Sequence, residues 1–316
     1  MFDFRDYGNG IYAFDSGYLR PQLAAVHMVV EKGRAAFFDT GINASLPAAL
    51  TALERVGLDA SAVDYVIPSH IHLDHAGGAG AMMRAFPNAR LIVHPRGARH
   101  MAEPSKLVAG VIGVYGEEYV RRMYGEILPI PFDRIIEATH EYEFSLAGRE
   151  FLCLDTPGHA RHHICVVERH SGAIFAGDMF GLVYPEMEVD GRQFIFPTTT
   201  PTQFEPEAMR QSIELLMSFR PPVMYLTHYG QARDIARLRT DLQRHIDAQV
   251  AIALAEKDAG EERHARIKAG LSRYLLTEAH QFGCPLSQEF LLQFWEPDFE
   301  LNAQGLECWL DAGCKG

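Results

Sequence analysis

The chain has 316 residues, of which 47% are hydrophobic and 22% are charged, and its formal net charge is −12. This length allows one large core with an appended region, or two domains. The acidic excess argues against nucleic-acid binding, which usually requires a basic surface. We see neither a basic, apolar leader nor an apolar run long enough to span a membrane, and the five cysteines form no Cys-x-x-Cys pair. We therefore expect a cytoplasmic protein with reduced thiols and no membrane partner.

Up to about residue 230, short β-rich runs alternate with helical patterns, which is typical of a layered α/β domain. The predicted strands cover 24–30, 35–38, 65–67, 90–93, 151–154, 164–167, 173–175 and 223–226. Helical periodicity predicts helices over about 46–56, 77–85 and 205–219, and a helical insert over about 100–135. Beyond residue 230 the strand patterns stop. We therefore expect a catalytic domain over 1–230 and a helical C-terminal region over 231–316.

The segment SHIHLDH, residues 69–75, directly follows a predicted strand and concentrates residues that bind metals. His70 and His72 are two residues apart, so they point to the same side of an extended chain. Asp74 and His75 fall near the start of the next predicted helix and can turn toward the same place. The segment therefore predicts a metal site.

Further histidines and acids stand at the ends of strand-like runs, each close to a glycine or a turn: Asp39, His159, Asp178 and His228. In a layered α/β domain, groups at one end of the strands converge on one edge. Imidazole and carboxylate ligands suit zinc, iron or manganese. Seven of these eight residues would already be too many ligands for one tetrahedral ion, and seven suit two ions that share a ligand. We expect two divalent ions, with Zn²⁺ favoured and Fe or Mn as alternatives.

The motifs SHIHLDH, TPGH, AGD and THYG, with the earlier FFDTG, resemble those of the metallo-β-lactamase-fold superfamily over residues about 10–230. The resemblance implies an α/β fold, an αβ/βα four-layer sandwich with the metals at one edge of its two sheets. It also implies a role for each candidate residue. The first ion would be held by His70, His72 and His159, the second by Asp74, His75 and His228, with Asp178 bridging them. Asp39 would orient a ligand histidine or its loop.

The seven-ligand set is similar to that of glyoxalase II, acyl-homoserine lactonases, thioesterase-like members and tRNA-processing phosphodiesterases of the superfamily. The acidic balance argues against the last group. Lactonases carry a tyrosine three residues after the bridging aspartate, where this chain has Gly181, and its nearest tyrosine is Tyr184. We therefore predict a dinuclear hydrolase that cleaves an ester, thioester or lactone of a small molecule through a metal-bridging hydroxide.

In this hypothesis Asp74 or Asp178 guides a proton toward the leaving group. Tyr184 or Tyr229 would donate to the oxyanion, and His162 would contact substrate. Two alternatives remain open: a mononuclear iron enzyme of the persulfide-dioxygenase type, and a weakly catalytic effector of the same fold. The insert is either ordinary helix-face core or a lid, and the C-terminal helices form either a wall of the site or a homodimer interface.

Overall fold

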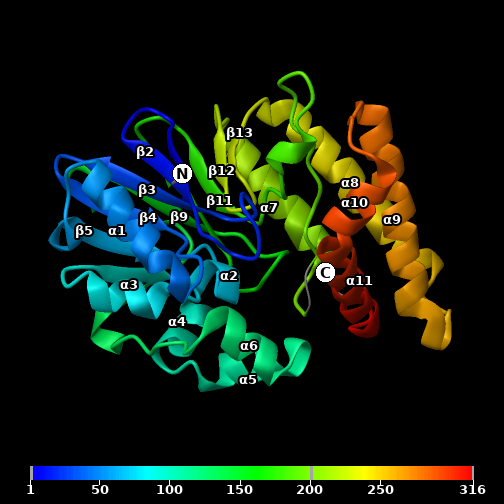
Figure 1. Ribbon diagram of the computed structural model, residues 1–316, viewed down its shortest axis with the longest axis horizontal. Helices are drawn as coiled ribbons and strands as arrows, with labels where there is room; N and C mark the ends of the chain where they lie inside the picture. The colour runs from blue at the N-terminus through cyan, green and yellow to red at the C-terminus, as the bar shows by residue number, and fades with distance from the viewer. Residues whose placement is uncertain (1–2, 200–201, 315–316) are drawn as a thin grey trace. The chain divides into compact units, whose positions relative to one another are not determined.

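The computed structural model describes residues 3–199 and 202–314, which divide into two compact units (Figure 1). The first unit comprises Met1–Asp155, His162–Gly177 and Pro222–Gln231. The second unit comprises Thr156–Arg161, Asp178–Pro221 and Ala232–Gly316. The chain therefore passes from one unit to the other at several points, and we describe each unit by itself.

The first unit is built on two mixed β-sheets. The first sheet contains, in order, β1 (Phe4–Asp6), β2 (Ile11–Asp15), β3 (Ala25–Glu31), β4 (Arg34–Phe38), β5 (Val63–Ile67), β6 (Arg90–Val93) and β7 (Ile135–Glu137). Neighbours from β1 to β4 are antiparallel, and neighbours from β4 to β7 are parallel.

The second sheet has the order β13-β12-β11-β10-β9-β8. Its strands are β8 (Tyr142–Leu146), β9 (Arg149–Asp155), β10 (Ile164–Glu168), β11 (Ile174–Gly177), β12 (Met224–Leu226) and β13 (Gly230–Ala232). Strands β8 to β11 pair antiparallel, and β11 pairs parallel with β12. The two sheets and the helices that alternate with their strands place the chain in the α/β class, as predicted.

Tight turns set the register of the first sheet. Strands β3 and β4 are joined by Lys32 and Gly33, whose φ angles are 45° and 77°. Positive φ at both central residues is the geometry of a type I′ hairpin turn, which matches the twist of the strands it joins. The resulting register places His27 of β3 opposite Phe38, the last residue of β4. Asp39 therefore directly follows Phe38, the residue that is paired with the buried His27.

Two apolar cores hold the first unit in layers. The core between the sheets includes Val29 and Phe38 from the first sheet and Phe151, Val166 and Phe175 from the second. The other core joins the outer face of the first sheet to flanking helices. Those helices are α1 (Leu46–Arg55), α3 (Ala79–Ala85) and α4 (Pro95–Ala102). Strands of the first sheet are therefore buried on both faces, which explains their nearly continuous apolar sequence.

The predicted insert forms two helices, α5 (Ser105–Tyr115) and α6 (Glu117–Tyr124). They belong to a small apolar cluster that also includes Tyr18, Ile42 and Leu73. Helix α5 has no fully buried residue, and its Tyr115 is 40% exposed. The insert is therefore held by fewer buried contacts than the sheets.

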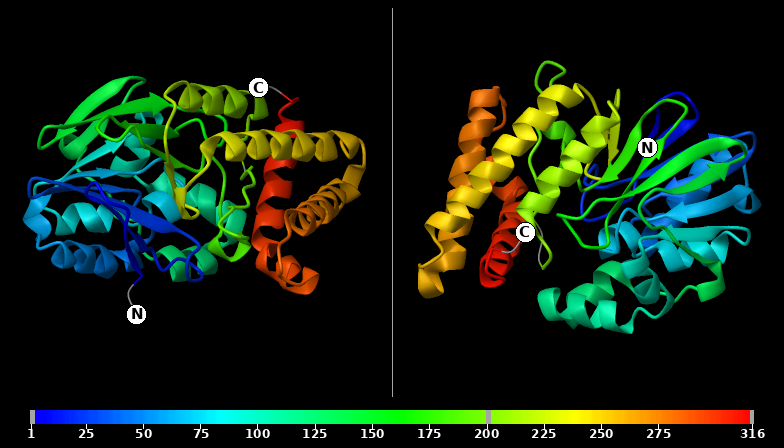
Figure 2. Two further views of the ribbon diagram at one scale, coloured as in Figure 1. Left: turned by 90° about the horizontal axis from the view of Figure 1, so that it is seen from above. Right: turned by 180° about the vertical axis from the view of Figure 1, so that it is seen from behind.

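The second unit is largely helical, and Figure 2 shows its long helices side by side. Its helices are α7 (Pro206–Ser218), α8 (Ile235–Ala255), α9 (Arg263–Phe282), α10 (Gln288–Phe294) and α11 (Glu296–Asp311). The end of α9 is marked by Gly283 at φ 91°, and α10 begins where the Ser287 side chain accepts a hydrogen bond from the Phe290 amide. Both are the usual signals for helix ends.

Every strand predicted from the sequence is present, with ends shifted by no more than three residues. Five short strands were not predicted: β1, β2, β7, β8 and β13. The helix expected over 77–85 is preceded by a separate one-turn helix, α2 (Leu73–Ala76), that carries Asp74 and His75. None of the described helices combines the length and apolar character that crossing a membrane requires.

Candidate metal centre

Several candidate residues of the first unit directly follow parallel strands. Asp39 is the first residue after β4, and β5 ends three residues before His70. His228 lies two residues beyond the end of β12. Loops that leave the carboxyl ends of parallel strands are the usual location of binding residues in α/β folds.

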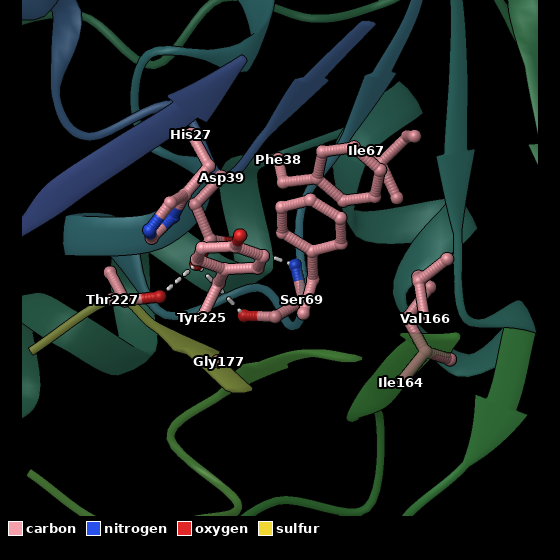
Figure 3. A pocket seen from close by; sticks show the side chains of 11 residues that line it. His27, Phe38, Asp39, Ile67, Ser69, Ile164, Val166, Gly177, Tyr225 and Thr227 are labelled. Atoms are coloured by element: carbon pink, nitrogen blue, oxygen red, sulfur yellow. Dashed lines mark hydrogen bonds between the residues drawn. The ribbon is translucent and has the colours of Figure 1, made fainter. Parts of the chain in front are cut away.

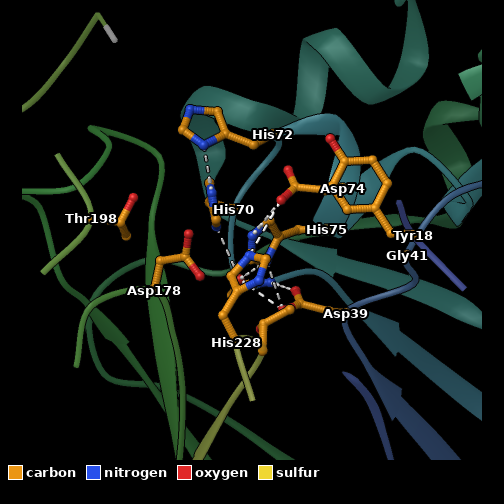
Figure 4. Close-up of polar contacts among 12 residues, drawn as sticks. Tyr18, Asp39, Gly41, His70, His72, Asp74, His75, Asp178, Thr198 and His228 are labelled. Atoms are coloured by element: carbon orange, nitrogen blue, oxygen red, sulfur yellow. Dashed lines mark hydrogen bonds and ion pairs between the residues drawn. The ribbon is translucent and has the colours of Figure 1, made fainter. Parts of the chain in front are cut away.

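Asp74, His75 and His228 form a compact group in the first unit. Each offers one ligand atom, and these atoms lie within 4.8 Å of one another. The Asp74 Oδ2 atom is 3.5 Å from His75 Nε2 and 3.3 Å from His228 Nε2 (Figure 4). Both imidazoles are buried, whereas the Asp74 side chain is 22% exposed. The group therefore directs one carboxylate and two imidazole nitrogens to one place that solvent can reach.

The two histidines of this group are held from behind by oxygen atoms. His75 Nδ1 is 2.9 Å from Asp39 Oδ2, and His228 Nδ1 is 2.7 Å from the carbonyl oxygen of Leu23. A carboxylate and a carbonyl only accept hydrogen bonds, so Nδ1 must carry the proton in both rings. The Nε2 atoms then present lone pairs beside Asp74. This is the tautomer that a metal-binding histidine needs.

Asp39 is the centre of a buried hydrogen-bond network. Its carboxylate accepts from the Ser69 amide at 2.6 Å, the Ser69 hydroxyl at 3.2 Å and His75 Nδ1 at 2.9 Å, and from the Thr227 hydroxyl. Four donors are about as many as the lone pairs of a carboxylate accept. Its backbone is left-handed, with φ 57°, a conformation that aspartate tolerates better than most residues. Asp39 therefore orients His75 and its loop.

His70 and His72 form a second pair in the first unit. His70 Nε2 lies 2.8 Å from His72 Nδ1, so a single ion could contact both nitrogens. The other nitrogen of His70, Nδ1, is 3.0 Å from the Ser69 hydroxyl. His162 Nδ1 accepts a hydrogen bond of 3.4 Å from the Ile71 amide, and the His162 ring stacks with that of His70. His162 thus contacts the loop that carries this pair.

His159 and Asp178 lie together in the second unit. His159 Nε2 is 3.5 Å from Asp178 Oδ2, and its Nδ1 is 3.3 Å from the carbonyl oxygen of Thr198. The same tautomer argument therefore applies to His159. Both residues are buried. Gly158, at φ 135°, allows the chain before His159 to pack closely on Met209 of α7, because a Cβ atom there would lie 2.3 Å from the backbone of Met209.

The residue before Asp178 must also be glycine. Gly177 has φ 52°, and a Cβ atom there would lie 2.6 Å from Ser69 Cβ and 2.8 Å from His163 Nε2. Cβ atoms essentially never approach other atoms this closely, and a side chain at this φ is strained in any case. The end of β11 is therefore built to pack tightly against the loop that begins SHIHLDH.

The two candidate tyrosines have other hydrogen-bond partners. The Tyr229 hydroxyl donates to Asp3 at 2.7 Å, and burial raises the pKa of Tyr229. The Tyr184 hydroxyl donates to Asp298 at 3.0 Å within the second unit. Tyr18, which was not predicted as a site residue, lies beside Asp74 (Figure 4). Burial, and then the negative charge of Asp74, raise the pKa of Tyr18. Its hydroxyl is 2.8 Å from that of Tyr124.

The supporting residues were not identified from the sequence. Ser69 and Thr227 each precede a candidate ligand, inside the motifs SHIHLDH and THYG, and this adjacency was the available signal. The carbonyl groups of Leu23 and Thr198 leave no signal in a sequence, because any residue supplies one. Tyr18 lies in an irregular segment far from the motifs.

The donor set fits divalent transition metals. Imidazole nitrogens and carboxylate oxygens are the ligands of zinc, iron and manganese sites. The oxygen partners behind His75, His228 and His159 are the outer contacts that fix a metal-binding ring. The chemistry of the residues therefore agrees with the predicted metal centre, and it does not select one metal.

Comparisons with known proteins agree with this fold. Residues 20–228 match the model of the metallo-beta-lactamase superfamily. A metallo-beta-lactamase fold-containing protein of Sulfurisphaera tokodaii is 25% identical over 229 residues, which are 70% of this chain and 78% of that protein. An N-acyl homoserine lactonase of Bacillus cereus is 35% identical over 114 residues, only 36% of each chain. The crystal structure of a metallo-beta-lactamase family protein from Thermus thermophilus has a TM-score of 0.68 at 20% identity, and covers 98% of this chain and 96% of that one.

The chain belongs to the metallo-beta-lactamase superfamily, because the family match covers well over half of its length. Its fold is the metallo-β-lactamase fold with a helical C-terminal region. Members of this superfamily generally bind divalent metals, and this chain carries His and Asp groups that could hold them.

Proposed function

We propose that this protein is a hydrolase that depends on two divalent ions and cleaves an ester, thioester or lactone bond of a small molecule. The observation that carries the proposal is a repeated arrangement of histidines. His75, His228 and His159 each have Nδ1 next to an oxygen acceptor and Nε2 next to an aspartate carboxylate. Histidines with a purely structural role are not expected to share one tautomer and to place Nε2 beside a carboxylate in each case.

The proposed ligands are the seven residues singled out in the sequence: His70, His72, Asp74, His75, His159, Asp178 and His228. When bound, two divalent ions supply Lewis-acid activation of water and of a carbonyl group. The protein's own residues hold the donor atoms in place. Asp39 orients His75, the Leu23 carbonyl orients His228, and the Thr198 carbonyl orients His159.

Asp74 is the candidate for moving a proton in this hypothesis. It is the most exposed member of its group, and a partly exposed carboxylate can exchange a proton with solvent or with a leaving group. Asp178 remains the alternative proton carrier. It is almost fully buried, so we assign it mainly to holding metal.

The surroundings of Asp74 favour a substrate with an apolar part. Tyr124 of the insert shares a buried apolar cluster with Leu73, the residue before Asp74. Burial and the negative charge of Asp74 both raise the pKa of Tyr124. The insert also presents half-buried apolar side chains, Val108, Val111 and Ile112. An apolar wall with a few polar groups is the usual lining of a small-molecule site. The partial similarity to an N-acyl homoserine lactonase supports including lactones among the candidate substrates.

The test combines metal analysis with a substrate panel. Metal-replete protein is assayed against esters, thioesters and lactones with short and long acyl groups, before and after chelation. We expect hydrolysis of at least one class, loss of activity on chelation, and loss in Asp74→Asn. Asp247→Asn serves as the matched control, because its carboxylate is exposed and pairs only with Arg210 among the described residues. Full activity in chelated protein, or no hydrolysis by metal-replete protein, would refute the proposal.

A further inference from the structure

A small polar cavity lies between the two sheets of the first unit, behind Asp39 (Figure 3). Its volume is about 10 Å³, about what a single water molecule requires. Five of its lining residues have polar side-chain atoms, namely His27, Asp39, Ser69, Tyr225 and Thr227. The remainder are mainly apolar residues of the core between the sheets, such as Phe38, Ile67 and Phe175.

His27 is unusual among the residues of this core. It is 2% exposed and lies on the face of β3 that also carries Val29, where it packs against the rings of Phe175 and Tyr225. Its Nε2 atom is buried and has no hydrogen-bond partner within the described part of the chain. A buried polar atom without a partner usually costs about 1–3 kcal/mol, so a ring of this kind normally has a ligand.

The position of His27 links it to Asp39. His27 is paired across the strands with Phe38, and Asp39 is the next residue. Burial lowers the pKa of His27 to about 4, so the ring is neutral near pH 7 and has one N–H to donate. Ser69 and Thr227, two of the hydroxyl residues that line the cavity, both donate to Asp39. Each hydroxyl oxygen can still accept a hydrogen bond.

We propose that His27 holds a single water molecule in this cavity and thereby acts as a positioning residue for Asp39. The water accepts from His27 and donates to the hydroxyl oxygens of Ser69 and Thr227. Both hydroxyl hydrogens are then turned toward Asp39, and this chain of hydrogen bonds strengthens each of its members. Asp39 in turn holds His75. The inference rests on the proposed metal site, because its effect is read at the ion that His75 would bind.

The experiment compares three variants. His27→Phe keeps an aromatic ring but removes the donor, and His27→Gln keeps a donor. Val29→Ala, on the same face of the same strand, removes apolar packing without touching a polar group. Metal affinity is measured by competition with a chelator, stability by thermal unfolding, and the water by a crystal structure.

We expect a water in the wild-type cavity and none in His27→Phe, whose metal affinity should fall by roughly 10-fold, the lower end of the range for outer contacts of a metal site. His27→Gln should recover most of that affinity. Val29→Ala should lower the melting temperature and leave metal affinity unchanged. This split between affinity and stability distinguishes a positioning role from a purely structural one.

Unchanged affinity in His27→Phe, or a cavity without water in the wild-type crystal structure, would overturn the inference. So would a loss of affinity in Val29→Ala equal to that in His27→Phe. Failure of the proposed function gives a different result: the wild-type protein itself would bind no metal, while the water could still be observed next to His27.

Discussion

At the residue scale, the candidate centre depends on oxygen atoms that hold imidazole rings in one tautomer. Asp39 orients more than one group, because it accepts hydrogen bonds from two side chains of the loops around the site as well as from His75. Removing its carboxylate takes away the acceptor 2.9 Å from His75 Nδ1 and leaves the Ser69 hydroxyl at 3.4 Å, so the ring is held less firmly.

We therefore expect Asp39→Ala to weaken metal binding by about 10- to 100-fold, the usual effect of losing an outer contact of a metal ligand. Chelator competition measures this change. Asp64→Ala is a suitable control, since that carboxylate pairs with Arg34 at the start of β4. A metal-bound structure in which Asp39 coordinates an ion directly would show that its role is assigned wrongly.

Asp178 has a different predicted role, because it is proposed as a ligand shared by both ions. Asp178→Ala removes one negative charge and one ligand, so the second ion should bind more weakly and hydrolysis should fall by orders of magnitude. Folding rests on the apolar cores, so the variant should remain folded. The measurements are ester and thioester hydrolysis together with thermal unfolding. A folded variant that hydrolyses at the wild-type rate would contradict the dinuclear hypothesis.

The sequence was sufficient to identify the residues with metal-binding chemistry, because their motifs follow strands. It was insufficient for the contacts that support them. Asp39 was expected to orient a ligand histidine or a loop, and its bond to His75 shows which histidine. His27 gave no signal, because a histidine on a strand is usually an ordinary core or surface residue. Its relation to Asp39 depends on the pairing of β3 with β4, which only the folded chain displays.

At the scale of elements, apolar patterns predicted most of the interior strands and missed the four edge strands, β1, β7, β8 and β13, together with β2. Strands β4 and β6 are continuous apolar runs buried on both faces, and they were predicted closely. Strands β1 and β7 are three residues long and lie at the two edges of the first sheet. Strands this short have no detectable period, and pairing with a neighbour forms them.

The insert has fewer buried residues than the sheets of the first unit, and Asn43 forms hydrogen bonds to one end of it. The Asn43 amide donates to the carbonyl oxygens of Tyr124 at 2.8 Å and Glu126 at 2.7 Å, at the end of α6. Two hydrogen bonds contribute about 1–3 kcal/mol in net terms, so Asn43→Ala should favour local opening of this segment.

We expect hydrogen exchange of the amides in 105–124 to become roughly 10-fold faster in Asn43→Ala, while exchange in the sheets is unchanged. Thr51→Ala, an exposed change on nearby α1, is the control. Equal acceleration in the sheets would show that the insert opens only with the whole unit. If the insert is a lid, the same variant should also alter the KM for substrates with long acyl groups more than for short ones.

At the scale of the whole molecule, we expected one domain boundary near residue 230. The two compact units are each made of several chain segments, so they do not test a single boundary, which stays a prediction. Residues 178–199 group with the C-terminal helices because of specific packing. The ring of Phe194 lies 5.8 Å from that of Trp295, and Asn302 accepts from the Thr199 amide at 2.8 Å. Contacts of this kind join segments about 100 residues apart, which no local sequence pattern reveals.

The final prediction concerns metal content and stability together. Seven ligands imply about two ions per chain, so elemental analysis of metal-replete protein should approach two. Ions that bind only the folded protein stabilise it by mass action: about 2.7 kcal/mol for each ion at a free concentration of 100 times Kd, so two ions should raise the melting temperature of a chain of this length by roughly 5–10 °C. Chelation should therefore lower the melting temperature by about this amount, and re-addition of zinc should restore it. The effect should be smaller in Asp74→Ala, which has lost a ligand, and unchanged in Asp247→Asn. A content of one ion that Asp74→Ala leaves unaltered would show that the second site does not exist.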